Sequence, residues 1–204
     1  MTVEIGSGIT GIGENSFRGC NNLTTVTIPA SLTEIGERAF MDCTSLVSIV
    51  PADNSATLAE YTKCYEGNLR VFTLPSTVTV IGPLAFYNSS FGETTVLNAA
   101  FNIPASTGNI EAQAFYGIPA THVCMFTSGL SVCEIGEKAF GNCAFLHYFE
   151  IVDGGANVSY IIADNAFAGC TDLVFIGTNN ADLQQYARDH GFTYLENETT
   201  AVGR

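Results

Sequence analysis

The sequence has few basic residues. Its 204 residues include 7 lysines and arginines against 20 aspartates and glutamates, which gives a formal net charge of −13. Binding to nucleic acid requires a basic surface that neutralises phosphates, and attraction to an anionic membrane requires the same charge. The composition therefore argues against both as partners.

The sequence also lacks long apolar runs and an export signal. No run approaches the roughly 20 apolar residues of a membrane span. The first residues, MTVEIGSGITGIG, have neither the basic segment nor the apolar core of a signal peptide. We expect either a cytosolic protein or a trimmed part of a longer exported one. The second is favoured because residues 3–17 align without gaps with residues 26–40, so the chain starts in mid-repeat.

Recognisable catalytic and metal-binding motifs are missing. The chain contains no Gly-x-Ser-x-Gly, no phosphate-binding glycine loop and no His-Glu-x-x-His. Cys124, Cys133, Cys143 and His147 form the densest group of possible ligands, but their spacing matches no zinc motif. A nucleophilic cysteine would need a base such as His122 or His147 beside it. We expect no cofactor, no metal and no enzymatic activity.

What the sequence does contain is one phrase repeated. IGENSFRGC at 12–20 returns as IGERAFMDC at 35–43 and as IGEKAFGNC at 135–143. The recurring phenylalanine stands at positions 17, 40, 86, 115, 140 and 167, at intervals of 23, 46, 29, 25 and 27 residues. The unit is therefore 23 residues long, and we expect about seven to eight units.

Two intervals are irregular. The interval of 46 predicts a degenerate copy whose strand is LRVFTLP at 69–75, similar to LTTVTIP at 23–29. Its phenylalanine position falls at Lys63, with Tyr61 or Tyr65 as the substitute. The interval of 29 predicts an inserted surface loop near Ser90 to Thr95.

Each unit has an extended half and a turning half. In LTTVTIP, apolar residues alternate with threonines and the segment ends at Pro29, which is typical of a short strand. IGERAFMDC predicts a tight turn followed by a single helical or 3₁₀ turn, with Gly36 allowing the bend and Phe40 pointing inward. Neither half buries its apolar face alone, so we expect the units to stack into a solenoid.

The pattern Ile-Gly-x-x-Ala-Phe-x-x-Cys-x-x-Leu-x-x-Val-x-Ile-Pro resembles the repeat of the BspA-like leucine-rich repeat family, from about Val3 to Ile176. The copy at 162–173 replaces the glycine, and the copy at 110–120 has Glu111 and Ile118 in the glycine and cysteine positions. The resemblance implies a right-handed, curved leucine-rich-repeat solenoid, with a parallel sheet on the concave face and turns on the convex face. It also implies surface display on host-associated bacteria or some protozoa, and protein binding rather than catalysis.

Four of the seven cysteines occupy one slot, three residues after the phenylalanine. They are Cys20, Cys43, Cys143 and Cys170. Because Ser89 and Ile118 fill the same slot elsewhere, we interpret it as a place for a small or medium buried group. Equivalent atoms of adjacent coils lie about 4.8 Å apart, too far for a relaxed disulfide. We expect free thiols, with Cys20–Cys43 and Cys143–Cys170 as the neighbouring pairs able to bridge.

Outward-facing strand positions are the candidate ligand-binding residues, namely Val71, Ala100, Met125, Tyr148 and Phe175. Their apolar and aromatic character predicts an exposed stripe on the C-terminal half of the concave sheet, and such patches mark interaction sites. Two other interpretations stay open: the C-terminal segment covers the stripe, or the register slips by one residue where the repeats are irregular.

The last segment leaves the repeat. Asn180 is a plausible N-cap and Gly191 a plausible stop, which predicts a helix over Ala181 to His190, then a strand over Phe192 to Leu195. We therefore expect a solenoid over 1–178, a cap over 179–195 and a flexible tail over 196–204.

Three functions remain. The first is an extracellular or cell-surface recognition or adhesion module, which we expect to be trimmed and monomeric in this form. Its partner would be a protein such as a host matrix or cell-surface component, or a glycan. The second is a structural spacer within a larger surface protein. An enzyme is the third.

Overall fold

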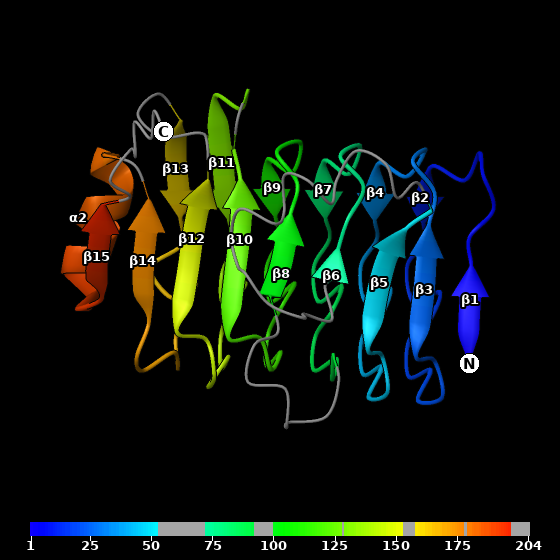
Figure 1. Ribbon diagram of the computed structural model, residues 1–204. Coiled ribbons are helices and arrows are strands. Elements are labelled where there is room, and N and C mark those ends of the chain that lie inside the picture. The colour runs from blue at the N-terminus through cyan, green and yellow to red at the C-terminus, as the bar shows by residue number, and fades with distance from the viewer. Residues whose placement is uncertain (53–71, 92–99, 128, 153–157, 178, 197–204) are drawn as a thin grey trace, which may run out of the picture.

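The structure is a computed structural model that describes residues 1–52, 72–91, 100–127, 129–152, 158–177 and 179–196. Parallel strands lie in two layers, and along most of the chain front and rear strands alternate (Figure 1). The buried apolar side chains fill the space between the layers. This is a parallel solenoid, as the repeats predict.

The front layer, which corresponds to the predicted concave sheet, contains a three-stranded sheet in the order β1-β3-β5 and a six-stranded sheet in the order β15-β14-β12-β10-β8-β6. We call the outer surface of this layer the front face. Its strands are β1 (Thr2–Glu4), β3 (Thr25–Ile28), β5 (Ser48–Pro51), β6 (Phe72–Thr73), β8 (Ala100–Ile103), β10 (His122–Phe126), β12 (Tyr148–Val152), β14 (Val174–Gly177) and β15 (Thr193–Glu196).

The rear layer is a second parallel sheet, in the order β13-β11-β9-β7-β4-β2. Its strands are β2 (Gly11–Ile12), β4 (Glu34–Ile35), β7 (Val80–Ile81), β9 (Asn109–Ile110), β11 (Val132–Ile135) and β13 (Ser159–Ile162). The sequence predicted turns on this side, and the sheet was not foreseen. Four of its strands are two residues long, which is too short for an alternating pattern to appear.

The turning half of each unit follows its rear strand. In the second copy, the Ala39 N–H donates to the Gly36 carbonyl at 3.2 Å and the Cys43 N–H donates to the Phe40 carbonyl at 3.3 Å. These hydrogen bonds between residues i and i+3 close tight four-residue turns, as expected. Arg38, with φ of 53°, takes the left-handed conformation that allows the bend.

Gly36 has a different role from the one predicted. A Cβ atom on this residue would lie 2.8 Å from the Ile12 carbonyl oxygen of the preceding coil. The glycine therefore permits a close approach between coils rather than a bend. Glu111 and Ala163 replace it in other copies, and both still donate a backbone hydrogen bond to the preceding coil, at 2.9 Å.

The recurring phenylalanines form one continuous ladder. Consecutive rings of Phe17, Phe40, Phe86, Phe115, Phe140 and Phe167 stack with centroids 5.1–5.3 Å apart and planes within 10° of parallel. Phe40 stacks directly on Phe86, 5.3 Å away, and Ile35 pairs directly with Ile81. The ladder has no room for another ring between them.

This stacking corrects the expected degenerate copy. Among the described residues, β4 pairs directly with β7, so no further rear strand lies between them, whereas Phe72 and Thr73 of LRVFTLP do form a front strand, β6. The family pattern accordingly matches as six copies. Lys63, Tyr61 and Tyr65 lie outside the described residues, as does most of the expected loop near Ser90 to Thr95.

The side chain in the cysteine slot donates a hydrogen bond to the backbone carbonyl of the phenylalanine in the preceding coil. The thiols of Cys43, Cys143 and Cys170 donate to the carbonyl oxygens of Phe17, Phe115 and Phe140, at 3.0, 3.2 and 3.2 Å. The hydroxyl of Ser89 donates to the carbonyl of Phe40 in the same way. A small hydrogen-bond donor therefore fills the slot in these four coils, whereas Ile118 fills it without a donor in another.

Burial keeps the thiols of Cys43 and Cys143 protonated and able to donate. It raises the pKa of the Cys43 thiol to about 11, and burial also raises the pKa of Cys143 above its ordinary range. The pKa of Cys170 is lowered instead, chiefly by a hydrogen bond with Cys143. Cys20, Cys43, Cys133, Cys143 and Cys170 are free, as expected, and Cys64 lies outside the described residues.

A helix and a strand cover the C-terminal end of the stack. Helix α2 (Ala181–His190) has the predicted bounds: the Asn180 side chain accepts from two backbone N–H groups of the first turn, and Gly191 ends the helix with φ of 73°. Tyr186 is buried, and its ring lies 6.0 Å from that of Phe167, the last of the ladder. No helix in the part of the chain that the structure describes is long and apolar enough to cross a bilayer.

Candidate functional site

Strand register decides which side chains reach the front face. In β10, β12 and β14, His122 lies beside Tyr148, which lies beside Val174. Two residues further along, Cys124, Glu150 and Ile176 form the next row. Because side chains alternate between the two sides of a strand, these two rows share one side of the sheet.

Two predicted site residues are in the core instead. Met125 is fully buried and pairs with Ile103 and Ile151, which are also buried, and Phe175 is 1% exposed. The expected exposure of both was wrong because each residue lies an odd number of positions from the row of Tyr148: Met125 pairs with Ile151, three positions further along, and Phe175 pairs with Phe149, one position further along. In β14, Phe175 lies beside Phe149 although it follows its leucine by one residue fewer, so the coil is locally shorter.

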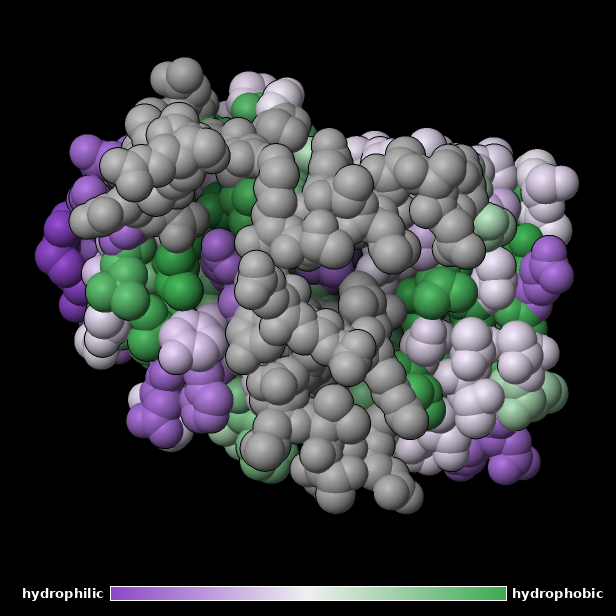
Figure 2. Space-filling model, in the orientation of Figure 1, coloured by the Kyte–Doolittle hydropathy of each residue, from purple (hydrophilic) through white to green (hydrophobic). Residues whose placement is uncertain are grey.

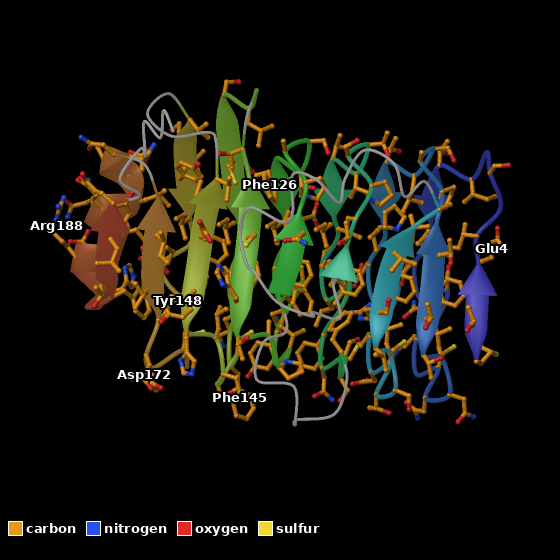
Figure 3. All side chains as sticks on the ribbon, viewed as in Figure 1. Glu4, Phe126, Phe145, Tyr148, Asp172 and Arg188 are labelled. Atoms are coloured by element: carbon orange, nitrogen blue, oxygen red, sulfur yellow. The ribbon has the colours of Figure 1, made fainter. Side chains whose placement is uncertain are left out.

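The other three predictions have different outcomes. Tyr148 is on the front face of β12, with 43% of its surface exposed (Figure 3). The backbone of Ala100 lies opposite His122 in the same row. Val71 lies outside the described residues. A role of these residues in ligand binding stays a prediction.

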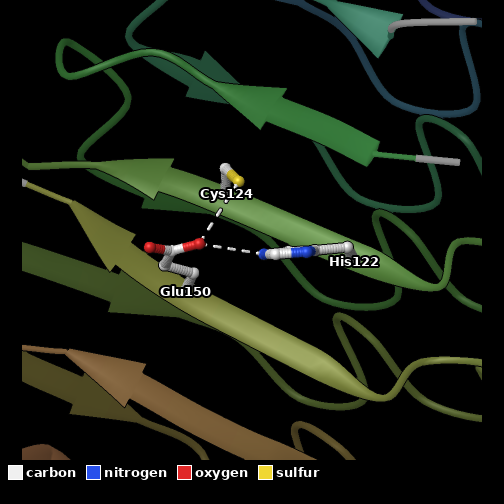
Figure 4. Close-up of side chains that lie close together, drawn as sticks. All are labelled: His122, Cys124 and Glu150. Carbon is white, nitrogen blue, oxygen red and sulfur yellow. Dashed lines mark hydrogen bonds and ion pairs between the residues drawn. The ribbon is translucent and has the colours of Figure 1, made fainter. Parts of the chain in front are cut away.

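Three potential metal-ligand side chains meet on this face, at β10 and β12 (Figure 4). Nε2 of His122 lies 3.1 Å from Oε2 of Glu150, and Sγ of Cys124 lies 3.9 Å from the same oxygen. All three ligand atoms are within 4.8 Å of one another. An imidazole, a thiol and a carboxylate thus converge on one point.

The surroundings of this group are mostly dry. His122 and Cys124 are buried, whereas the Glu150 side chain retains 17% exposure. The ring of Tyr148 lies 5.6 Å from the imidazole of His122. Beyond the group, Cys124 packs in a small apolar cluster with Phe126, Val152 and the partly buried Ala105.

Sequence reasoning did not find this group. It considered Cys124 with Cys133, Cys143 and His147, but Cys133 contacts the Met125 sulfur in the core and Cys143 occupies a rear slot. His122 and Cys124 are two residues apart, which on a strand places both on one face. That spacing was the one sign of the group in the sequence. Placing Glu150 beside these two residues also requires the correct register between β10 and β12.

An apolar patch lies beside the group. We call it the front-face patch: it consists of Tyr148, Val174, Ile176 and Leu195. Tyr148 and Leu195 are 43% and 50% exposed, and the two others are partly exposed. Ile176 lies beside Glu150 on one side and Leu195 on the other, so the patch is continuous across β12, β14 and β15. Hydrophobic side chains gather at this end of the front face (Figure 2).

The repeat pattern matches a known family. The BspA-type leucine-rich repeat region matches residues 1–100 and 90–189, in six copies. No curated protein is similar enough to count as a relative.

Solved structures share the fold. The pneumococcal vaccine antigen PcpA superimposes with a TM-score of 0.64 at 15% identity, over 97% of this chain, which spans 41% of the PcpA chain. A leucine-rich repeat protein of T. pallidum superimposes with a TM-score of 0.56 at 21% identity, over 95% of this chain and 85% of the other. At these identities the likeness concerns the fold alone.

Proposed function

Since the chain belongs to the BspA-type leucine-rich repeat proteins, we propose that it is a non-catalytic recognition module that binds a protein ligand through its front face. Solenoids of stacked repeats present long, continuous surfaces that suit this role. The observation that carries the proposal is the front-face patch, in which the exposed Tyr148 and Leu195 flank the partly exposed Val174 and Ile176.

The patch has the composition of a binding surface. Aromatic side chains supply large contact areas and dominate the energy of many interfaces, and Tyr148 combines an apolar ring with a hydroxyl group. His122 and Glu150 border it with polar groups that fix orientation. The net charge of −13 favours a partner with a basic surface and makes association faster at low salt.

We also propose display outside the cell, on a bacterial surface, with host matrix or cell-surface proteins among the ligands. Membership of the BspA-type repeat family supports this location, and one protein that shares the fold is described as a vaccine antigen. The alternative is a spacer whose partners bind other parts of a longer protein.

The test is a binding assay against extracellular-matrix proteins, cell surfaces and glycans. The informative variant is Tyr148→Ser with Leu195→Ser, which changes two exposed side chains and should leave the fold intact. The matched control is Phe145→Ser with Ile161→Ser. Phe145 lies in a turn and is 52% exposed, and Ile161 lies on rear strand β13 and is 57% exposed.

The proposal predicts that a ligand bound by the wild type is lost by the front-face variant and retained by the control. Equal binding by both variants would move the site away from this patch. Absence of binding by the wild type across the panel would favour the spacer.

A further inference from the structure

We propose that His122, Cys124 and Glu150 form a binding site for a divalent transition-metal ion of the zinc type. This inference goes beyond ligand recognition and does not depend on it. It stands on the arrangement of three different ligand groups around one point of the front face.

The strands hold these ligands in place. His122 and Cys124 are two residues apart on β10, so their side chains leave the same side of the strand. Glu150 lies on β12 directly beside Cys124 in register. Both strands have parallel neighbours on each side, which makes the backbone under the site a rigid scaffold.

The distances are close to those of a tetrahedral site. Zinc binds imidazole nitrogen and carboxylate oxygen at about 2.0–2.2 Å and thiolate sulfur at about 2.3 Å, so two ligand atoms of one ion lie roughly 3.3–3.6 Å apart. The nitrogen–oxygen separation here is 3.1 Å and the sulfur–oxygen separation is 3.9 Å. The nitrogen and the sulfur lie within 4.8 Å of each other, so binding requires the side chains to rotate toward a common centre.

Charge supports a cation at this point. When Cys124 binds as a thiolate it carries one negative charge, and Glu150 carries a second, so a divalent ion with neutral His122 gives a site with no net charge. This balance matters because His122 and Cys124 are buried, where uncompensated charge is costly. Without an ion, His122 and the Cys124 thiol both hydrogen-bond the same Glu150 oxygen, so a metal ion would replace these two contacts with bonds to all three groups.

A further polar group lies alongside. Asn102, on β8, pairs in register with Cys124 and is 3% exposed. Its Oδ1 atom has no hydrogen-bond partner among the described residues. Three protein ligands leave a fourth position of a tetrahedral ion open to water. Such a water is a donor of the kind that the Asn102 oxygen lacks.

The ligand set selects the class of ion. Thiolate and imidazole are too soft for Ca²⁺ or Mg²⁺, which prefer oxygen ligands, whereas a mixture of sulfur, nitrogen and oxygen suits zinc and cobalt. On binding, the Cys124 thiol loses its proton to solvent, the sulfur forms the metal bond, and no electron is transferred. Affinity therefore rises with pH.

The experiment is a titration of the reduced, chelator-treated protein with Co²⁺, followed by competition with Zn²⁺. We expect one Co²⁺ per chain, a thiolate-to-cobalt charge-transfer absorption, and loss of that absorption when Zn²⁺ displaces the probe. Cys124→Ser should abolish the absorption. His122→Gln and Glu150→Gln should each weaken binding by about tenfold or more, since each removes a ligand.

The matched control is Cys20→Ser. Cys20 is partly exposed and lies in a slot near the other end of the solenoid, so adventitious metal would bind this more accessible thiol. The control should bind Co²⁺ as the wild type does. If Cys124→Ser does not fold, judged by circular dichroism in chelator, the His122 and Glu150 variants carry the test with the thiol intact. Wild-type affinity in those variants, an absorption that depends on Cys20, or no binding at all would overturn the proposal.

Discussion

The cysteine slot provides a test of how adjacent coils are held together. The thiol of Cys143 is fully buried and donates to the Phe115 carbonyl of the preceding coil at 3.2 Å. We consider two replacements of Cys143, by serine and by alanine. Serine keeps a donor and alanine removes it, while both are smaller than cysteine, so the comparison separates hydrogen bonding from size.

The expected magnitudes follow from the environment of the thiol. A net intramolecular hydrogen bond contributes about 1 kcal/mol, and a buried acceptor that loses its donor costs about 1–3 kcal/mol. Cys143→Ser loses mainly packing around the sulfur, and we expect a cost of about 1 kcal/mol. Cys143→Ala loses the donor too, and we expect about 2 kcal/mol. For a chain of this size, a loss of about 2 kcal/mol corresponds to a fall in Tm of roughly 4–8 °C.

The assay is equilibrium unfolding in urea under reducing conditions, with thermal unfolding as a second probe. Ser89→Ala is the companion variant, because the hydroxyl of Ser89 donates to the Phe40 carbonyl in the equivalent slot. It should lose stability in the same range as Cys143→Ala. If the alanine variant of Cys143 were as stable as the serine variant, the slot would select size alone and the hydrogen-bond explanation would be wrong.

Two further predictions concern close packing and pH. Gly36→Ala should destabilise the fold by about 1–3 kcal/mol, because its Cβ would lie 2.8 Å from the Ile12 carbonyl. Gly13→Ala, at the same repeat position with only the Ser16 hydroxyl at 3.4 Å, should cost less in the same urea assay. Burial raises the pKa of Cys43 to about 11 and that of Cys133 to about 12, both from 9.0. Their contribution to stability is therefore complete below pH 9 and lost as pH rises from 9 towards 12, so urea midpoints should fall across this window; an unchanged midpoint at pH 11 would contradict it.

Much of the fold was predictable because the same pattern of apolar residues occurs several times in the sequence. The phenylalanine spacing gave the stacking unit, and the rings do form one ladder. The helix over Ala181 to His190 was predictable from local signals, since Asn180 and Gly191 have the residue types that caps require. The rear sheet was not, because its pairing joins residues a full coil apart through strands as short as Glu34–Ile35.

The candidate site was harder to predict than the fold. A slip of one residue moves every side chain of a strand to the other side of the sheet, and the repeats around β10 and β14 are irregular. This is why Met125 and Phe175 were expected on the surface, whereas their neighbours Cys124 and Ile176 hold the front-face positions.

The sequence by itself determined the class of molecule: a chain of stacked coils, acidic overall, with buried phenylalanines, free thiols and a capping helix. These properties depend on local patterns that recur or on composition, and neither needs knowledge of which strands are neighbours. Only the tertiary structure decided that His122 and Cys124 on one strand face Glu150 on the next. The physical reason is that strands about 26 residues apart in the chain lie one hydrogen-bonded spacing apart in the sheet, and their exact register depends on turns whose length varies.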